Sequence, residues 1–460
     1  MTPGFGPVVF GARGSRLAAS DARTLWSSAL IPNDQFLLYC FDGTRQPVDR
    51  LARHLAARAA TLPELRTRVA EVPGGLDYPY WVRGDAVDVR THDGGDWVAG
   101  GGVRGVREAV AALFADQLDP RVAAWRLHLF GPVVGAPRCT AEGIVVVLQI
   151  SHALADGRRA SDIARRLLTR QPPDIDTVLP GRWGPVPAAA AAALGWVGFP
   201  TALARTVVRG AGAVPARSEL DRRTEDGDVP PPADPCPPTS LNTRPGPARD
   251  IRLLVRGRAD LAAGGSTVTV GGLTAISLAL ERLLTVRGED VPGALTAEVT
   301  VARPRRGDEH NAFGNVSVPL HPGTPVSLRR SLIGRSLRAA RDRAADPAWA
   351  RIRAADASVP AVLARIGIRG FDIDTPPPVV GGATVVSSVA RGDSDLVLGG
   401  GRVAFTAGFP ALSPAMGVTH GIHGIGEVVT LTVTSAPEAL PDPDGYAALL
   451  AAAVDELREA

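Results

Sequence analysis

Residues 145–168 of this 460-residue chain, VVVLQISHALADGRRASDIARRLL, decide its fold. The stretch opens with a continuous, β-branched run, which is typical of a strand buried on both faces. His152 follows this run at once, and Asp156 and Gly157 precede a segment with the apolar spacing of a helix. Ligands of α/β sheets bind in the crevice beyond such strand ends. The stretch therefore predicts an α/β protein whose site lies at the loop that carries His152.

Histidine is suited to proton transfer, because its unperturbed pKa of about 6.5 lets it take up and return a proton near neutrality. We therefore interpret His152 as a general base; a packing or surface histidine at a strand end is the alternative. Asp156 is placed to cap the following helix and to form an ion pair with an arginine, and Gly157 to permit the turn. These two residues are expected to hold the shape of the loop.

The sequence contains no lysine, so all 50 of its Lys and Arg residues are arginines. Schiff-base enzymes, pyridoxal-phosphate enzymes and P-loop NTPases each need a lysine amine in their chemistry. All three classes are excluded.

The formal net charge of +3 gives no reason to expect a nucleic-acid partner. Cys40, Cys139 and Cys236 lie far apart with no CxxC motif, so neither a zinc knot nor a disulfide scaffold is expected, and a reducing cytoplasm fits. His420 and His423 are spaced like metal ligands, but the glycines around them disfavour the helix that such a pair needs. We predict no metal site.

The length of the chain predicts two domains. Strand-like and helix-like segments alternate in both halves, and a segment rich in Pro, Asp and Gly separates them. We place an N-terminal domain at residues 1–215, a linker or crossover at 216–250 and a C-terminal domain at 251–460.

Residues 184–204, GPVPAAAAAALGWVGFPTALA, carry no charge. Their length would suffice to span a bilayer, but most are Ala or Gly, and Pro187 and Pro200 are expected to interrupt a helix. We interpret the stretch as an Ala-rich helix of a cytoplasmic protein, because no signal peptide precedes it. A peripheral contact with a membrane or a lipid droplet is the alternative.

The motif SHALADG resembles the HHxxxDG motif of CoA-dependent acyltransferases, and its flanks are similar to the bacterial wax ester synthase/diacylglycerol acyltransferase family. The similar blocks follow the family's order along nearly the whole chain. They are IPNDQFLL, ELRTRV with YWVRGDAVDVRTH, QLDPRVAAWRLHLF, TSLNTRPGPAR, VTVARPRRGDEHNAFGNVSVPLHPGTP, VVSSVARGDSDLVLGGGRV and the terminal helix.

The resemblance implies an α/β fold of two chloramphenicol-acetyltransferase-like domains with the active site in a tunnel between them. It implies acyl transfer from acyl-CoA, as a co-substrate, to a hydroxyl-bearing acceptor, by default a long-chain alcohol or diacylglycerol, with no bound cofactor. His152 matches the family's general base. Asp156 matches the motif aspartate, which an arginine of the second domain supports; we assign that role to Arg303. Asn315 matches a Gly-Asn block and is expected to line the tunnel.

The chain departs from the family pattern at the motif's first histidine, which is Ser151 here. A family Asn-Asp pair that opens a helix is replaced by Gly271 and Gly272. We expect these three residues to line the active site, and either the Ser151 hydroxyl or a backbone N–H at the two glycines to stabilise the oxyanion. These changes leave the acceptor open.

Two alternatives remain at the level of the sequence. One is a condensation-type or specialised-metabolite acyltransferase that uses another acceptor or a carrier-protein thioester. The other is a non-catalytic relative that binds acyl-CoA or lipid. The sequence does not specify the oligomeric state.

Overall fold

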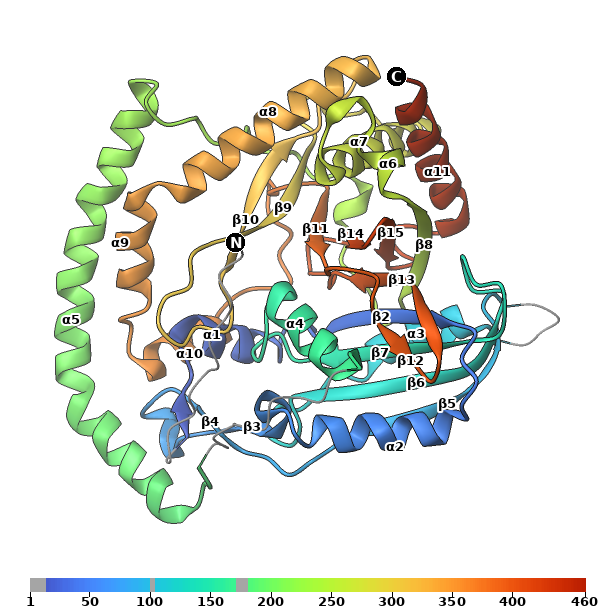
Figure 1. Ribbon diagram of the computed structural model, residues 1–460. Helices are drawn as coiled ribbons and strands as arrows, with labels where there is room; N and C mark the ends of the chain where they lie inside the picture. The colour runs from blue at the N-terminus through green and yellow to red at the C-terminus, as the bar shows by residue number, and fades with distance from the viewer. Residues whose placement is uncertain (1–13, 100–103, 171–180) are drawn as a thin grey trace.

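The computed structural model describes residues 14–99, 104–170 and 181–460, and within these ranges the strands form two six-stranded sheets and one three-stranded sheet (Figure 1). The first sheet has the spatial order β12 (Val397–Leu398), β13 (Gly401–Phe409), β2 (Gln35–Asp42), β7 (Gly143–Ile150), β6 (Trp125–Val134) and β5 (Val89–Asp96). The second has the order β10 (Phe313–Pro319), β9 (Thr296–Ala302), β11 (Thr384–Ala390), β14 (Val418–Ile425), β15 (Val428–Ser435) and β8 (Asp250–Gly257). The small sheet contains β1 (Ser15–Arg16), β4 (Tyr80–Arg83) and β3 (Thr67–Ala70).

Eleven α-helices accompany these sheets within the described ranges. They are α1 (Ala19–Ser27), α2 (Val48–Ala59), α3 (Val106–Ala112), α4 (Gly157–Leu168), α5 (Pro185–Glu225), α6 (Arg258–Leu261), α7 (Val268–Val286), α8 (Val326–Ala345), α9 (Pro347–Asp356), α10 (Ala361–Arg369) and α11 (Pro443–Glu459).

The motif strand β7 lies in the middle of the first sheet, between β2 and β6, and all of its residues are buried. Val146 and Leu148 face the core formed with α2 and α4, whereas Val145 and Val147 face a second core that includes residues of α3 and β8. Burial on both faces explains why β7 is apolar without alternation. The strand thereby delivers His152 to the point where the two halves of the chain meet.

The second sheet packs against α7, α8 and α11. Helix α7 is mostly buried, so its apolar sequence is that of a core helix. The expected α/β class is confirmed.

The C-terminal half contributes strands to the first sheet. Strand β13, from the C-terminal half, pairs antiparallel with β2 and so extends the first sheet. The domain boundaries drawn from the sequence remain a prediction, but three elements pass across them: β12 and β13 join the N-terminal sheet, and α5 continues through residue 215 to Glu225.

Helix α5 is 41 residues long and packs lengthwise against α9 at one side of the molecule (Figure 1). The expected Ala-rich helix is present, but the expected interruptions were wrong. Pro187 lies in the first turn, where its missing N–H would have no partner, and the helix continues through Pro200 and Pro215. The part of α5 that follows Pro200 is supported by α9, through contacts such as those of Arg209 with Ala354 and of Arg217 with Trp349.

Candidate active site

The loop between β7 and α4 places the motif residues as the sequence predicts. His152 lies two residues beyond the end of β7, and Asp156 is the N-cap of α4, where its carboxylate accepts a hydrogen bond of 2.9 Å from the Arg159 N–H. The N-cap bond satisfies one of the free N–H groups of the first helical turn. The loop therefore has a fixed shape where the imidazole leaves the sheet.

His152 lines a cavity of about 1210 Å³ between the two halves of the chain. The N-terminal half contributes the motif loop, the start of α4 and Gln35; the other half contributes β9, β10, the end of β11, and parts of α8 and α9. A site between the halves is what the sequence predicts.

The His152 ring is oriented by a residue of the other half. Its Nδ1 lies 2.8 Å from Oδ1 of Asn311, and the ring packs at 5.1 Å, centroid to centroid, on Phe313. The Asn311 Nδ2 group donates to the His152 carbonyl (2.7 Å) and to a carboxylate oxygen of Asp21 (3.0 Å). Two contacts thus join Asn311 to His152.

Asp21, in α1, is fully buried and accepts three N–H bonds from the segment that carries Asn311. The backbone N–H groups of His310 and Asn311 donate at 2.8 and 2.9 Å, and the Asn311 amide supplies the third bond. Burial raises the pKa of Asp21 to about 6, although these hydrogen bonds act in the opposite direction. A pKa of about 6 leaves the carboxylate mostly ionised at pH 7.

Burial also lowers the pKa of His152 below its ordinary value, and hydrogen bonding of the ring to the backbone of His152 itself and to Asn311 partly offsets this effect. A buried imidazole with a lowered pKa is neutral at pH 7. Neutral imidazole is the form that accepts a proton.

The arginine partner of Asp156 is Arg305, and the assignment to Arg303 was wrong. The Arg305 Nη2 atom lies 3.4 Å from both carboxylate oxygens of Asp156. Arg303 instead forms an ion pair of 2.6 Å with Glu309 and donates to the Asn311 carbonyl at 2.9 Å. The chain turns after β9, so residues two positions apart point to different partners; Arg303 supports the loop indirectly, through Asn311.

Asp156 also connects the two halves through the backbone. Its carboxylate accepts from the Ala312 N–H at 3.1 Å, and its own N–H donates to the His310 carbonyl at 3.3 Å. The prediction that Asp156 holds the loop shape agrees with these contacts.

The glycine pair expected at the reaction centre lies elsewhere. Gly271 and Gly272 are buried in α7 and do not line the cavity. A Cβ at Gly271 would lie 1.9 Å from the Leu261 carbonyl oxygen, and one at Gly272 would lie 2.5 Å from the Ile422 side chain. The Gly271 N–H donates within the helix to Thr267, so it is not an oxyanion donor. These glycines allow close packing of α7.

Of the other residues expected to lie in the active site, some line the cavity and one does not. Asn315 and Gly157 line the cavity, and the Asn315 amide donates to Glu298 at 3.0 Å. Ser151 is buried and does not line the cavity. Its hydroxyl accepts a hydrogen bond from the Ala153 N–H, and this bond shapes the turn before α4. Gly157 is the first residue of α4 and has no positive φ, so the turn at this point does not require a glycine for its backbone conformation.

Asp21, Asn311 and Arg305 are functional candidates that the sequence did not single out. Arg305 and Asn311 lie inside a block similar to the family, but no spacing rule points to them. Asp21 lies 290 positions from Asn311, and only the fold brings them together.

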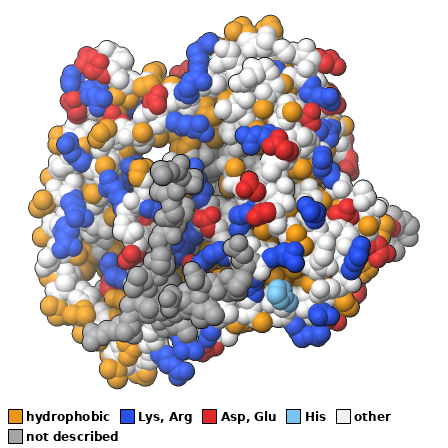
Figure 2. Space-filling view, viewed as in Figure 1, with side chains coloured by type: hydrophobic (Ala, Val, Ile, Leu, Met, Phe, Trp, Pro, Cys, Tyr) orange, Lys and Arg blue, Asp and Glu red, His pale blue; other side chains and the backbone are white. Residues whose placement is uncertain are grey.

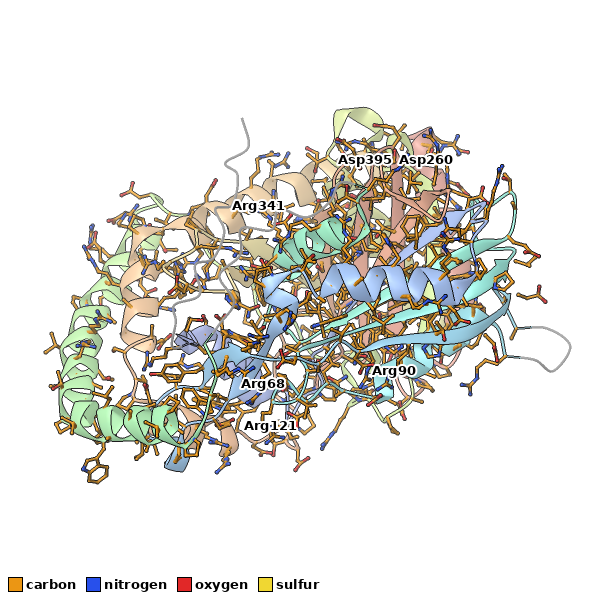
Figure 3. All side chains as sticks on the ribbon, turned by 60° about the horizontal axis from the view of Figure 1, so that its bottom comes forward. Arg68, Arg90, Arg121, Asp260, Arg341 and Asp395 are labelled. Atoms are coloured by element: carbon orange, nitrogen blue, oxygen red, sulfur yellow. The ribbon has the colours of Figure 1, made fainter. Side chains whose placement is uncertain are left out.

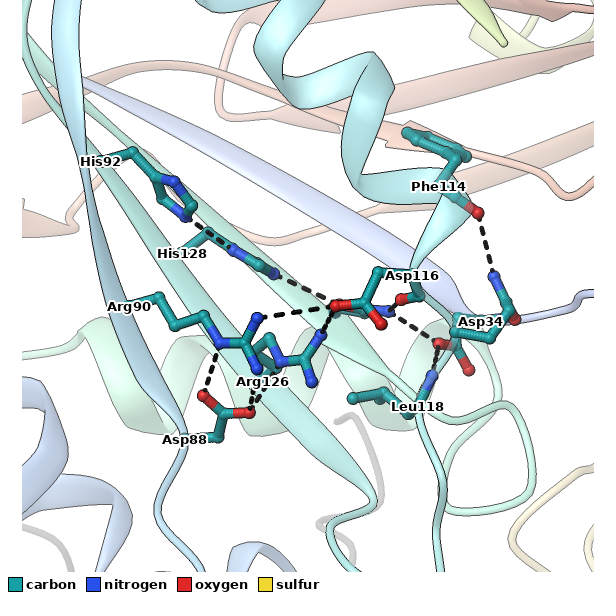
Figure 4. A network of polar contacts seen from close by, with 11 residues as sticks. Asp34, Asp88, Arg90, His92, Phe114, Asp116, Leu118, Arg126 and His128 are labelled. Carbon is teal, nitrogen blue, oxygen red and sulfur yellow. Dashed lines mark hydrogen bonds and ion pairs between the residues drawn. The ribbon is translucent and has the colours of Figure 1, made fainter. Parts of the chain in front are cut away.

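A second buried polar network lies under the first sheet, away from the cavity (Figure 4). His92 and His128 are joined at 2.9 Å, His128 contacts Gln149 at 3.2 Å, and Gln149 donates to Asp34 at 2.8 Å. Burial raises the pKa of Asp34 to about 6 and lowers that of His128 to about 4.

Comparisons with known proteins agree with this geometry. Residues 38–263 match the family model "Wax ester synthase/diacylglycerol acyltransferase catalytic domain". The wax ester synthase/diacylglycerol acyltransferase from Marinobacter aquaeolei VT8 has a similar structure, with a TM-score of 0.63 and 19% identity over 96% of this chain and 98% of that one.

Two condensation domains share the fold. A starter condensation domain of rhizomide synthetase RzmA, a mutant in complex with C8-CoA, matches with a TM-score of 0.54 and 14% identity, over 97% of this chain and 94% of that one. The first condensation domain of the CDA synthetase matches with a TM-score of 0.53 and 15% identity, over 98% and 96%. The motif loop, the cavity between the two halves and the family match lead to one conclusion: residues 38–263 are similar to the catalytic domain of wax ester synthase/diacylglycerol acyltransferases, and the chain is an acyltransferase.

Proposed function

We propose that this acyltransferase moves an acyl group from acyl-CoA to a hydroxyl-bearing acceptor, with His152 as the general base. One observation carries the proposal. His152 lines the cavity with Nδ1 engaged by Asn311, and among the described residues no hydrogen bond reaches Nε2. A neutral imidazole that lines a cavity and has one ring nitrogen without a hydrogen bond is arranged for proton abstraction.

The reaction proceeds by direct transfer. Nε2 takes the hydroxyl proton while the acceptor oxygen attacks the thioester carbonyl carbon. The tetrahedral intermediate then collapses, the C–S bond breaks, and the imidazolium returns its proton to the sulfur of CoA. Ester and free CoA are the products, and no bound cofactor or metal takes part. A general base of this kind contributes ~10²–10⁴-fold in rate.

Arginines around the cavity support CoA as the donor. Arg158, Arg341 and Arg353 line it, and Arg341 lies on α8 (Figure 3). Arginine is well suited to the phosphates of CoA, because its guanidinium binds phosphate oxygens in pairs. The related starter condensation domain was solved with C8-CoA in its structure.

The acceptor follows the family default, a long-chain alcohol or diacylglycerol. A smaller, more polar alcohol is the second candidate, because the hydroxyls of Ser387 and Ser388 and the amide of Gln35 line the cavity beside apolar residues. A carrier-protein thioester in place of acyl-CoA is the alternative donor.

The experiment is release of CoA thiol from acyl-CoA donors of increasing chain length, with and without long-chain alcohol, diacylglycerol and small alcohols. We expect acceptor-dependent release that His152→Ala reduces at least a hundredfold. His54→Ala is the matched control, because His54 is an exposed histidine on α2. If His152→Ala retains full activity, the base assignment is wrong. If no donor is used while an acyl-carrier thioester is, the donor assignment is wrong.

We also propose that α5 binds the surface of an anionic membrane or lipid droplet from the cytoplasm. Its outward side carries exposed apolar residues, including Trp196 (69% exposed), Val197 (75%) and Val208 (70%). Hydrophobic side chains follow the edge of the molecule where α5 lies, and side chains point away from the protein there (Figures 2 and 3). Residues 185–218 contain three arginines and no acidic residue. An exposed apolar helix face flanked by arginines is typical of helices that lie in the interface of anionic lipid.

This contact is tested by sedimentation with phosphatidylcholine vesicles, with and without phosphatidylglycerol. We expect binding that increases with phosphatidylglycerol and is lost when Trp196 and Val197 are both changed to Glu. Val286→Glu is the control, because Val286 is equally exposed (78%) but lies at the end of α7. Equal binding of the α5 variant and the wild type would contradict the proposal.

A further inference from the structure

A chain of hydrogen bonds runs from α1 to the base through a loop of the other half. The Asp21 carboxylate accepts from the Asn311 amide, and the Asn311 carbonyl oxygen faces Nδ1 of His152. Asp21 is fully buried and Asn311 is 3% exposed, so solvent does not compete for these bonds. Neither residue was identified from the sequence.

The groups that Asn311 contacts determine which atom donates in each hydrogen bond of this series. A carboxylate and a backbone carbonyl can only accept, and both lie against Nδ2 of Asn311. This end of the amide must therefore be the NH₂ group, and the oxygen must be the end that faces His152. An oxygen can only accept, so Nδ1 carries the hydrogen, and the lone pair of the neutral ring is on Nε2.

The same bonds restrict the ring's movement. Asn311 binds the side chain of His152 through its oxygen and the backbone of His152 through its nitrogen, at 2.8 and 2.7 Å. The Asp21 carboxylate in turn holds the Asn311 side chain and two backbone N–H groups. Rotation of the ring would break the Asn311 bond and leave a buried amide oxygen without a partner, which costs free energy.

We propose that Asp21 and Asn311 are positioning residues that hold His152 in the Nδ1–H tautomer, with Nε2 directed into the cavity. The effect of this positioning on the reaction rate rests on the proposed function, whereas the tautomer of His152 does not depend on that function. The two residues come from different halves of the chain, so the base is correctly oriented only when the halves are packed together. They also support the motif loop where the first motif histidine is replaced by Ser151.

The test is ¹⁵N NMR of protein labelled at histidine, with the His152 signals assigned by their loss in His152→Ala. We expect the wild type at pH 7.5 to show a protonated Nδ1 and an unprotonated Nε2. In Asn311→Leu, which has a similar volume and no acceptor, we expect a shift toward the Nε2–H form. Asn33→Leu is the control, because Asn33 donates to Thr24 of the same helix as Asp21 but does not contact His152.

Kinetics provide the second readout. We expect Asn311→Leu to lower kcat about 10–100-fold, within the range of a general base, with little change in KM for the acyl-CoA. We expect the acid limb of the pH profile to move in the same variant, because the bond from Nδ1 contributes to the pKa of His152. Asp21→Asn, with the same shape, is expected to show a smaller loss in the same direction and serves if Asn311→Leu does not fold.

The outcomes separate the two proposals. An Nε2–H signal in the wild type, or an unchanged tautomer and kcat in both folded variants, would overturn the positioning role. Full activity of His152→Ala together with an Nδ1–H tautomer that depends on Asn311 would overturn the proposed base and leave the positioning of the ring in place.

Discussion

Gly271→Ala is predicted to destabilise the protein, against the usual effect of this change in a helix. Alanine is about 1 kcal/mol more favourable than glycine in a helix interior. At Gly271, however, the added Cβ would lie 1.9 Å from the Leu261 carbonyl oxygen, and ordinary contact begins at 3.4 Å. Helix α6 would have to move by about 1.5 Å, because a backbone oxygen has no rotamer to change.

Such overpacking costs ~1–3 kcal/mol, and a backbone contact this short belongs at the upper end. After the gain in helix propensity is subtracted, we expect a net loss of about 2 kcal/mol. For a unit of about 200 residues, one kcal/mol corresponds to about 2–4 °C in Tm, so Gly271→Ala should lower Tm by about 4–8 °C.

Gly334→Ala is the matched control. Gly334 is also a buried helical glycine, in α8, but its Cβ would meet atoms no closer than 3.7 Å. We expect this variant to raise Tm by up to about 4 °C. Differential scanning fluorimetry of both variants is the assay, with kcat measured at 20 °C to show that the site remains intact. Equal or higher stability of Gly271→Ala would refute the close contact between α6 and α7.

The remaining predictions concern the ion pair, the buried acid and the thiols. Arg305→Ala should lower kcat more than Arg303→Ala, because Arg305 is the direct partner of the motif aspartate; a larger loss in Arg303→Ala would reverse the assignment. Burial raises the pKa of Asp34 to about 6, whereas an exposed aspartate titrates near 3.9, so the folded chain holds this proton more tightly. Stability against urea should therefore fall as pH rises from about 4 to about 6, and Asp34→Asn should weaken that fall; an unchanged slope would contradict the burial argument. The Sγ atoms of Cys40 and Cys139 lie 3.5 Å apart, so oxidation with diamide should join them in a disulfide, seen as the loss of two thiols by mass spectrometry; two free thiols after treatment would contradict this.

The parts of the site that are local in sequence could be predicted from it. A buried strand, a histidine and a helix cap are close in sequence, so spacing alone places His152 and Asp156 on one loop. The choice between Arg303 and Arg305 could not be made in this way, because it depends on how the chain turns after β9. The contact of Asp21 with Asn311 depends on the packing of the two halves, and no local pattern encodes it.

For the fold too, the local pattern was predictable from the sequence and the long-range pairing was not. Alternating strands and helices indicated an α/β protein with two halves. The destination of β13 was not predictable, because an apolar strand pairs equally well with the edge of either sheet. The glycines at 271 and 272 were assigned to the active site by analogy, and the structure places them in a helix-packing contact instead.

The transfer of β13 to the first sheet determines where the two halves can bend. Because β13 pairs with β2 along seven residue pairs, it moves with the first sheet, although the segments before and after it belong to the other half. A motion that widened the cavity without breaking sheet hydrogen bonds would therefore bend the chain on either side of β12 and β13. Those two connections, rather than the sheets, are the places where the molecule can adjust to the length of an acyl chain.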